Sequence, residues 1–249
     1  MLLACALGMQ TSTPQKAEDT EVWAPLPPSV TPGALVPAPP PPGAVVLLGD
    51  SDLSAWASSR DGSAARWTVD HGVMTVAKAT GNLETRAHFG SYRLHLEWRI
   101  PAGITGEGQT RGNSGLFLAS TGPGDEGYEI QILDGYRNPT YANGQVGSIY
   151  KQAVPLANPS RPPGEWQSYD IDWTAPVFAD DGTLVRPARV TVRMNGVLVQ
   201  DDVALTGPTV FVGTPRYEAH GRAPIKLQDH GDPSAPISFR NIWLHETDR

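Results

Sequence analysis

The chain has 249 residues and a formal net charge of −7. A protein that binds phosphate backbones needs clustered lysine and arginine, so this charge argues against nucleic acid as a partner. The single cysteine, Cys5, excludes an intrachain disulfide framework and a cysteine-based metal site. The 26 glycines and 24 prolines indicate many turns between short strands.

The first 43 residues are expected to form a tether rather than a packed domain. The segment LLAC, which ends at Cys5, is similar to a bacterial lipobox, in which a small residue precedes a cysteine that becomes lipidated. A chance match in an unstructured tail is the alternative. Residues 10–42 are polar and then proline-rich, which favours an extended, disordered linker. A lipid at Cys5 would place the protein in the bacterial cell envelope, either in the periplasm or on the cell surface. This lipid is the only membrane attachment that the sequence predicts.

Residues 44–249 are predicted to form a single all-β domain. In residues 91–100 the apolar side chains share one face, whereas Arg93, His95, Glu97 and Arg99 share the other. The same alternation recurs at residues 114–120, 128–134, 168–173, 188–202, 224–229 and 238–244. An Asn-Gly pair at 195–196 predicts a two-residue hairpin turn. Because no helical period is evident, we expect one sandwich of two antiparallel sheets.

Neither a cofactor nor a metal site is predicted. Residues 122–127 fit the pattern G-x-G-x-x-G, but they lead into a predicted strand, which offers no helix N-terminus to hold a pyrophosphate. Glu129, Asp134, Asp229 and His230 carry oxygen or nitrogen donors that a metal ion could use. Their spacing matches no metal-binding motif, so none is assigned.

The strand predicted within residues 126–135 has a polar face of uncertain role. Its tyrosine and two isoleucines share one side, whereas Glu129 and Gln131 share the other. The simpler interpretation is an ordinary solvated face. Asp134 lies five residues after Glu129 and should point to the opposite side, unless a β-bulge returns it to the Glu129 face. Turn formation by Asp134 before Gly135 explains this aspartate equally well.

Polar residues at other strand ends extend the candidate site. His230 is the best-placed general acid or base, because imidazole titrates near neutral pH, although many loop histidines are only surface residues. The candidate substrate-binding residues are Arg111, Asn113, Gln131, Gln145, Tyr150, Gln228 and Glu97. Amide, aromatic and carboxylate groups in this mixture suit a neutral, hydroxyl-rich ligand, and sugars are the obvious class.

Eight segments between residues 46 and 244 resemble the 3-keto-disaccharide hydrolase family, long catalogued as a bacterial domain of unknown function. They are, in order, LHLEWRIP, GNSGLFL, YEIQILD, GQVGSIY, PPGEWQSYDI, ARVTVRMNGVLVQD, LQDHG and FRNIWL. The resemblance implies a concanavalin A-like jelly roll with a concave groove, related to laminarinase-like glycosidases, and a 3-keto-glycoside as substrate. Laminarinases carry the signature E-x-D-x-x-E. Here the comparable residues are Glu129, Gln131 and Asp134, so the ordinary retaining mechanism is not expected.

A ketone at C3 of the substrate explains this departure. The carbonyl makes the hydrogen on C2 acidic, so the glycosidic bond at C1 can break by elimination, with water added afterwards. This route needs a base, an acid and donors for the enolate, rather than two carboxylates. The hypothesis assigns proton transfer to Glu129 and His230 with Asp134 as helper, and carbonyl or hydroxyl binding to Arg111, Asn113, Gln131 and Gln228.

Two other functions fit the same sequence. A jelly roll hosts non-catalytic carbohydrate-binding modules as readily as hydrolases, so a lectin-like surface module is the main alternative. A structural surface protein that binds a partner chain is the second alternative, and it would expose an apolar patch of a few hundred Å² or more.

Overall fold

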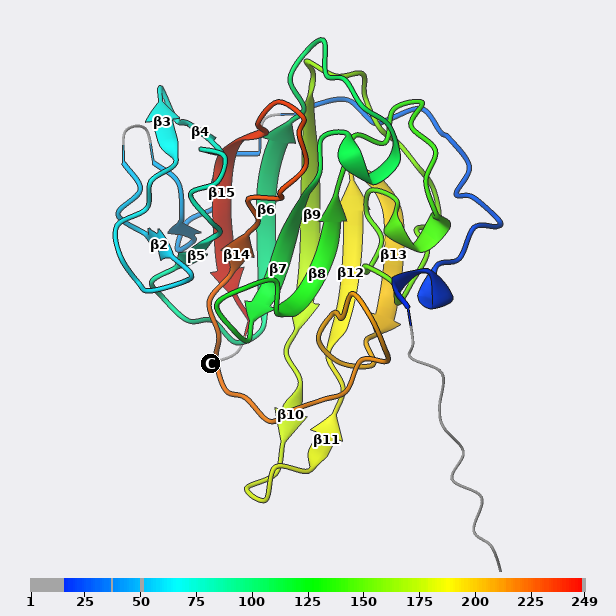
Figure 1. Ribbon diagram of the computed structural model, residues 1–249. Coiled ribbons are helices and arrows are strands. Elements are labelled where there is room, and N and C mark those ends of the chain that lie inside the picture. The colour runs from blue at the N-terminus through cyan, green and yellow to red at the C-terminus, as the bar shows by residue number, and fades with distance from the viewer. Residues whose placement is uncertain (1–15, 37, 50–51, 248–249) are drawn as a thin grey trace, which may run out of the picture.

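The computed structural model describes residues 16–36, 38–49 and 52–247. Cys5 and the lipobox-like start lie outside these residues. Two antiparallel sheets are stacked face to face (Figure 1), so the expected all-β sandwich is confirmed. In the described part of the chain the helices are short 3₁₀ turns, η1 (Ala17–Thr20), η2 (Gly108–Thr110) and η3 (Ala142–Gly144). No helix there is long and apolar enough to cross a membrane.

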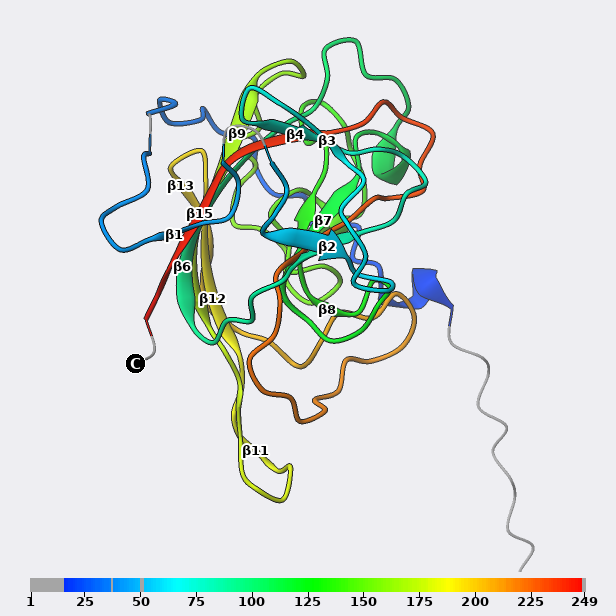
Figure 2. The ribbon, with the colours of Figure 1, turned by 90° about the vertical axis from the view of Figure 1, so that its left-hand side faces the viewer.

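Among the residues that the structure describes, the larger sheet has eight strands and the smaller has five. In the larger sheet the order is β13 (Val197–Ala204), β12 (Arg189–Met194), β9 (Trp166–Thr174), β6 (Tyr92–Arg99), β15 (Ser238–Glu246), β4 (Val73–Thr75) and β3 (Thr68–Asp70), and β1 (Val45–Val46) also pairs with β15. The smaller sheet runs β2 (Trp56–Ser58), β5 (Leu83–Thr85), β14 (Lys226–Leu227), β7 (Ser114–Ser120) and β8 (Gly127–Ile132). Strands β10 (Val177–Phe178) and β11 (Leu184–Arg186) form a separate hairpin that projects from one end of the sandwich (Figures 1 and 2).

The core fills the space between the sheets and follows from the alternation in the sequence. The inward-facing side chains of β6 and β8 are buried: Tyr92, Leu94, Leu96, Trp98, Tyr128, Ile130 and Ile132. Full burial of a large apolar side chain contributes about 1.5–3 kcal/mol. Two buried tyrosine hydroxyls connect the layers, because Tyr92 donates to the carbonyl of Leu118 and Tyr169 to that of Gln131, both at 2.6 Å. These bonds fix β8, and therefore its outer face, over the larger sheet.

Asn195 and Gly196 form the turn between β12 and β13, which confirms the predicted hairpin. Their φ angles of +50° and +77° lie in the left-handed region that a two-residue turn of this kind uses. The Asn195 side chain accepts a hydrogen bond from the Ser168 N–H at 2.8 Å and donates to the Pro159 carbonyl at 2.9 Å. The turn is therefore tied to the start of β9.

The described part of the expected tether is packed on the domain instead of being free. The Val30 N–H donates to the Asn158 carbonyl at 3.1 Å, and the Gly33 N–H donates to the Asn195 carbonyl at 2.9 Å. In Figure 1 the blue chain runs from the dark-blue η1 up the right-hand edge of the sandwich, and Figure 2 labels β1, where this segment joins the larger sheet. Proline content indicates an extended backbone. It does not reveal that loops of the domain supply partners for that backbone, which is why the free tether was the wrong expectation for these residues.

Candidate active site

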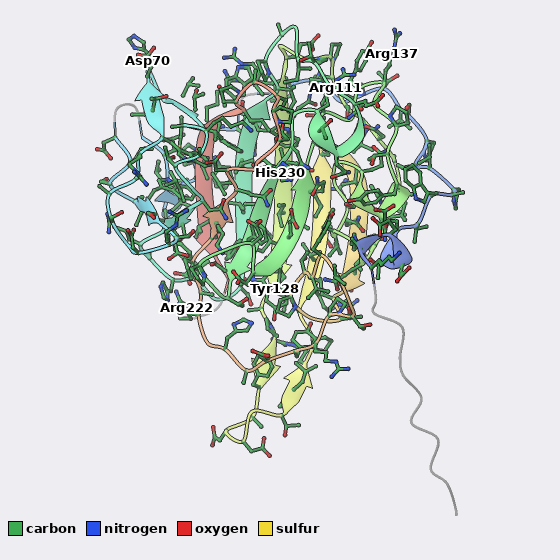
Figure 3. All side chains as sticks on the ribbon, viewed as in Figure 1. Asp70, Arg111, Tyr128, Arg137, Arg222 and His230 are labelled. Atoms are coloured by element: carbon green, nitrogen blue, oxygen red, sulfur yellow. The ribbon has the colours of Figure 1, made fainter. Side chains whose placement is uncertain are left out.

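A pocket of about 400 Å³ lies on the outer face of the five-stranded sheet. Six of the residues proposed from the sequence line it: Asn113, Glu129, Gln131, Tyr150, Gln228 and His230. Figure 3 shows His230 in the region of β7 and β8. These two strands form the floor of the pocket. The polar side of β8 is therefore not an ordinary solvated face. It is buried beneath loops and opens into this pocket.

Glu129 presents its carboxyl group to the pocket without a hydrogen-bond donor from the described residues. Only its backbone is engaged, where the N–H donates to the Thr209 hydroxyl at 3.1 Å. Burial raises the pKa of this carboxyl to about 8, and the negative charge of Asp125 adds to the shift. At neutral pH Glu129 is therefore mostly protonated, which is the state of a general acid.

Gly115 on the neighbouring strand β7 makes room for the Glu129 carboxyl. A Cβ atom at Gly115 would lie 2.5 Å from Oε1 of Glu129. The glycine is needed for this close approach rather than for an unusual backbone angle. The Glu129 carboxyl can occupy this position because Gly115 has no side chain there.

His230 is paired with a buried aspartate. Its Nδ1 lies 3.1 Å from Oδ2 of Asp232, and its Nε2 lies 3.4 Å from the Asn113 side-chain nitrogen. Burial acts to raise the pKa of Asp232, but hydrogen bonds from His230 and Ser234 and the charge of Lys78 lower it to about 2. The Asp232 N–H also lies 3.2 Å from Nδ1, but a hydrogen bond to the ionised Asp232 carboxylate is stronger than this neutral contact and favours the tautomer with the proton on Nδ1. The lone pair of Nε2, which accepts from Asn113, is then available as a base beside the pocket.

A network of amide groups holds the floor of the pocket. Asn113 donates to the Gln109 carbonyl at 2.9 Å and accepts from the Gln131 side chain at 2.9 Å. Gln109 in turn donates to the Gly144 carbonyl at 2.8 Å. Among the described residues, Oε1 of Gln228 is buried without a hydrogen-bond partner. An unsatisfied amide in a pocket is a group that a ligand hydroxyl can engage.

Tyr150 and Tyr141 place a pair of hydroxyls on another wall. The two oxygens are 2.6 Å apart, so one hydroxyl donates to the other and one proton remains for a ligand. Burial raises the pKa of Tyr150 to about 12, and it raises that of Tyr141 further with help from Tyr150. Both phenols therefore stay protonated and serve as hydrogen-bond donors rather than as bases.

Asp134, Arg111 and Gln145 do not reach the pocket. The Asp134 carboxylate is buried, lies 2.7 Å from Nε of Arg111, and accepts the Tyr136 N–H at 3.0 Å. The bulge interpretation of Asp134 was wrong, because the irregularity between β7 and β8 falls at residues 117–120, near the other end of β8. Turn formation and an ion pair explain this aspartate instead. The buried Gln145 side chain donates to the Thr140 carbonyl at 3.2 Å.

Glu97 was wrongly grouped with these residues, because it lies on the outer face of the other sheet. Its carboxylate accepts from Arg240 at 2.7 Å and from Asn241 at 2.9 Å. A groove of about 470 Å³ also lies on that face. Two charged groups that line the groove, Arg93 and Asp172, are paired with each other at 2.8 Å. The other carboxylate that lines it, Asp170, lies 2.7 Å from Nδ1 of His95, so among the described residues neither carboxylate of this groove is unpaired as Glu129 is.

Comparison with known proteins identifies the family. Residues 43–245 match the family model described as the 3-keto-alpha-glucoside-1,2-lyase-like domain. The chain belongs to this family. The resemblance seen in the sequence is thereby confirmed, and all the residues that line the pocket except Glu21 lie within the matched range.

Solved structures agree with this family assignment. A candidate glycosyl hydrolase from Parabacteroides distasonis ATCC 8503 is 50% identical, with a TM-score of 0.79 over 92% of this chain and 95% of that chain. Two further candidate glycosyl hydrolases of that organism are 19% and 20% identical, with TM-scores of 0.60 and 0.56. They cover 83% and 82% of this chain and 94% and 98% of their own, and they show a shared fold alone. None of the curated proteins compared with the chain matches it.

Several residues of the pocket could not be identified from the sequence. They are Glu21, Gln109, Thr110, Asp125, Tyr141, Thr209 and Phe211. Glu21 precedes the family match and belongs to the segment expected to be a tether, so nothing marked it. Asp232 could have been identified from the sequence, because an aspartate two residues after a candidate catalytic histidine can lie close enough to hydrogen-bond its ring. Within the described ranges, no three His, Cys, Asp or Glu side chains gather to hold a metal ion.

Proposed function

We propose that this protein cleaves the glycosidic bond of 3-keto-glucosides by elimination across C1 and C2. The observation that carries the proposal is that two residues line the same pocket: Glu129, whose carboxyl has no donor among the described residues and a raised pKa, and His230, whose Nδ1 lies 3.1 Å from the Asp232 carboxylate. A retaining glycosidase instead uses two carboxyl groups about 5–5.5 Å apart. Here Gln131 and the ion-paired Asp134 occupy the positions comparable to the other acids of the laminarinase signature.

The residues divide the reaction between them. Nε2 of His230 takes the proton from C2, and the electron pair moves onto the C3 oxygen to give an enolate. When the ketone re-forms, this electron pair makes the C1–C2 double bond and the C1–O bond breaks. Glu129 gives its proton to the departing oxygen, so the products are an unsaturated 3-keto sugar and an alcohol. The Tyr150 hydroxyl and the side-chain NH₂ group of Gln228 donate to the C3 oxygen and stabilise the charge that develops there. Addition of water across the double bond then gives the free 3-keto sugar.

Methyl 3-keto-α- and β-glucosides, each assayed beside its unoxidised parent, test this proposal. We expect methanol release from a keto substrate only, with a primary isotope effect when C2 carries deuterium. Equal cleavage of an unoxidised parent would overturn the elimination chemistry. Sugar binding without turnover of any substrate would instead identify a carbohydrate-binding module.

The Gly115→Ala variant should lower kcat/KM by about 10-fold or more, because the added methyl group displaces the Glu129 carboxyl. The added Cβ would also lie 3.0 Å from Cε2 of the buried Phe117, so the free energy of unfolding should fall by about 1–3 kcal/mol. Steady-state kinetics and thermal melting of the same sample check both statements. Gly221→Ala is the matched control, because a Cβ atom at Gly221 meets nothing within 4 Å. Unchanged kinetics in Gly115→Ala would contradict the proposed placement of Glu129.

A further inference from the structure

A second pocket of about 620 Å³ adjoins the first and shares Glu21, Gln109 and Tyr141 with it. One of its other walls is Trp23. Both Glu21 and Trp23 precede residue 43, where the family match begins. The space next to the reaction pocket is therefore bordered partly by a segment that the family domain does not include.

Trp23 is exposed but held in one orientation. Its side chain is 61% exposed, which is unusual for a residue that would otherwise be placed in a core. The indole N–H donates to Oε2 of Glu21 at 3.1 Å, and the ring meets Tyr141 edge to face at 5.9 Å. One apolar face with a fixed direction is the arrangement on which a sugar ring stacks.

The segment that carries Trp23 is fastened to the domain on both sides of Glu21. The buried side chain of Asn143 donates to the Thr20 carbonyl and accepts from the Val22 N–H, both at 2.9 Å. Lys151 donates to the Ala17 carbonyl at 2.7 Å and to the carbonyl of Phe211, which lines the first pocket, at 2.8 Å. The platform is thus built before any ligand arrives, which lowers the entropy lost on binding.

We propose that Trp23 and Glu21 form a second sugar subsite, which holds the sugar released as the leaving group. This inference rests on the proposed function, because the catalytic pair in the first pocket fixes where the 3-keto ring lies. Trp23 would stack on the apolar face of the second ring, while the Glu21 carboxylate contacts its hydroxyls. The preferred substrates are then 3-keto-disaccharides rather than glycosides of small alcohols.

The test compares a 3-keto-disaccharide with methyl 3-keto-glucoside of the same anomer, using the full chain and its Trp23→Ala variant. We expect KM for the disaccharide to rise about tenfold in the variant, whereas KM for the methyl glycoside changes less than twofold. Trp23→Tyr should restore most of the loss, since it keeps an aromatic face. Val185→Ala, on the distant β11 and 65% exposed, is the control for loss of an exposed apolar side chain.

A binding measurement separates failure of this inference from failure of the proposed function. Calorimetry with Glu129→Gln needs no turnover, and Trp23→Ala in that background should weaken disaccharide binding about tenfold. If no substrate is turned over but this loss is seen, the subsite stands and the lyase chemistry fails. Equal effects of Trp23→Ala on both substrates, or no effect on either, would overturn the subsite.

Discussion

The Glu129→Gln variant is expected to lose about 1,000-fold or more in kcat on a 3-keto-glucoside and yet to unfold at a higher temperature than the wild type. The catalytic loss follows because an amide cannot protonate the departing oxygen. The gain in stability follows because the wild-type carboxyl is buried without a donor from the described residues. Steady-state kinetics and thermal melting of one preparation measure both effects.

The gain in stability should depend on pH in a defined direction. The pKa of Glu129 is raised from 4.5 to about 8 on folding. Below pH 4 the carboxyl is protonated in both states, so it does not oppose folding. Between pH 4.5 and 8 the unfolded chain ionises first, and the wild type loses stability. The whole change in the pKa of Glu129 corresponds to roughly 5 kcal/mol of lost stability in the wild type. In Glu129→Gln this loss is absent, but the cost of burying the glutamine amide offsets part of the gain. We therefore expect Glu129→Gln to gain about 2 kcal/mol at pH 9 and little at pH 4.

Activity of the wild type should fall in the same alkaline range. An acid with a pKa of about 8 is progressively lost above that pH, so kcat/KM should decline there. Glu165→Gln, an exposed glutamate exchange, is the control and should alter neither activity nor melting. A Glu129→Gln protein that is less stable than the wild type at pH 9 would contradict the raised pKa.

Replacement of His230 by alanine is expected to lower kcat by about 100- to 10,000-fold, because the base for C2 is removed. Asp232→Asn should also lower kcat, by about 100- to 10,000-fold. Its amide can donate to Nδ1 and so stabilise the tautomer whose Nε2 carries a proton. Hydrogen–deuterium exchange at C2 of the bound substrate, followed by NMR, measures the proton-transfer step directly.

The exchange experiment also distinguishes a chemical role for His230 from a structural one. Glu129→Gln should retain exchange at C2 while losing alcohol release, whereas His230→Ala should lose both. His71→Ala is the control, because this histidine side chain is 95% exposed and lies in the turn between β3 and β4, away from the residues that line the pocket. Exchange at the wild-type rate in His230→Ala would assign the base to another residue.

The fold could be predicted because its determinants are local. Alternation along residues 91–100 marks a strand with one buried face, and an Asn-Gly pair favours the left-handed angles of a tight turn. These signals do not depend on which strands become neighbours. They therefore identified the sandwich and its main strands without any knowledge of the sheet order.

The site could be predicted only in part, because it depends on which strands become neighbours. Alternation placed Glu97 and Glu129 on polar faces, but it does not say that the two strands belong to different sheets. The spacing of residues could not determine whether a β-bulge returned the Asp134 side chain to the Glu129 face or whether Asp134 formed a turn. The ion pair with Arg111, a tertiary contact, decides that question. Glu21 reached the pocket through docking of an extended segment, for which the sequence offers no periodic signal.

The docked N-terminal segment has a practical consequence for how such proteins are delimited. A protein cut at residue 43 would keep all the described strands of both sheets, since β1 begins at Val45. It would nevertheless lack Glu21 and Trp23, which border the two adjoining pockets. Assays of such a shortened protein on a range of substrates would detect the reaction of the domain. We expect them to miss the preference for particular leaving groups that Glu21 and Trp23 would confer. Comparisons among family members therefore need the residues that come before the shared domain as well as those within it.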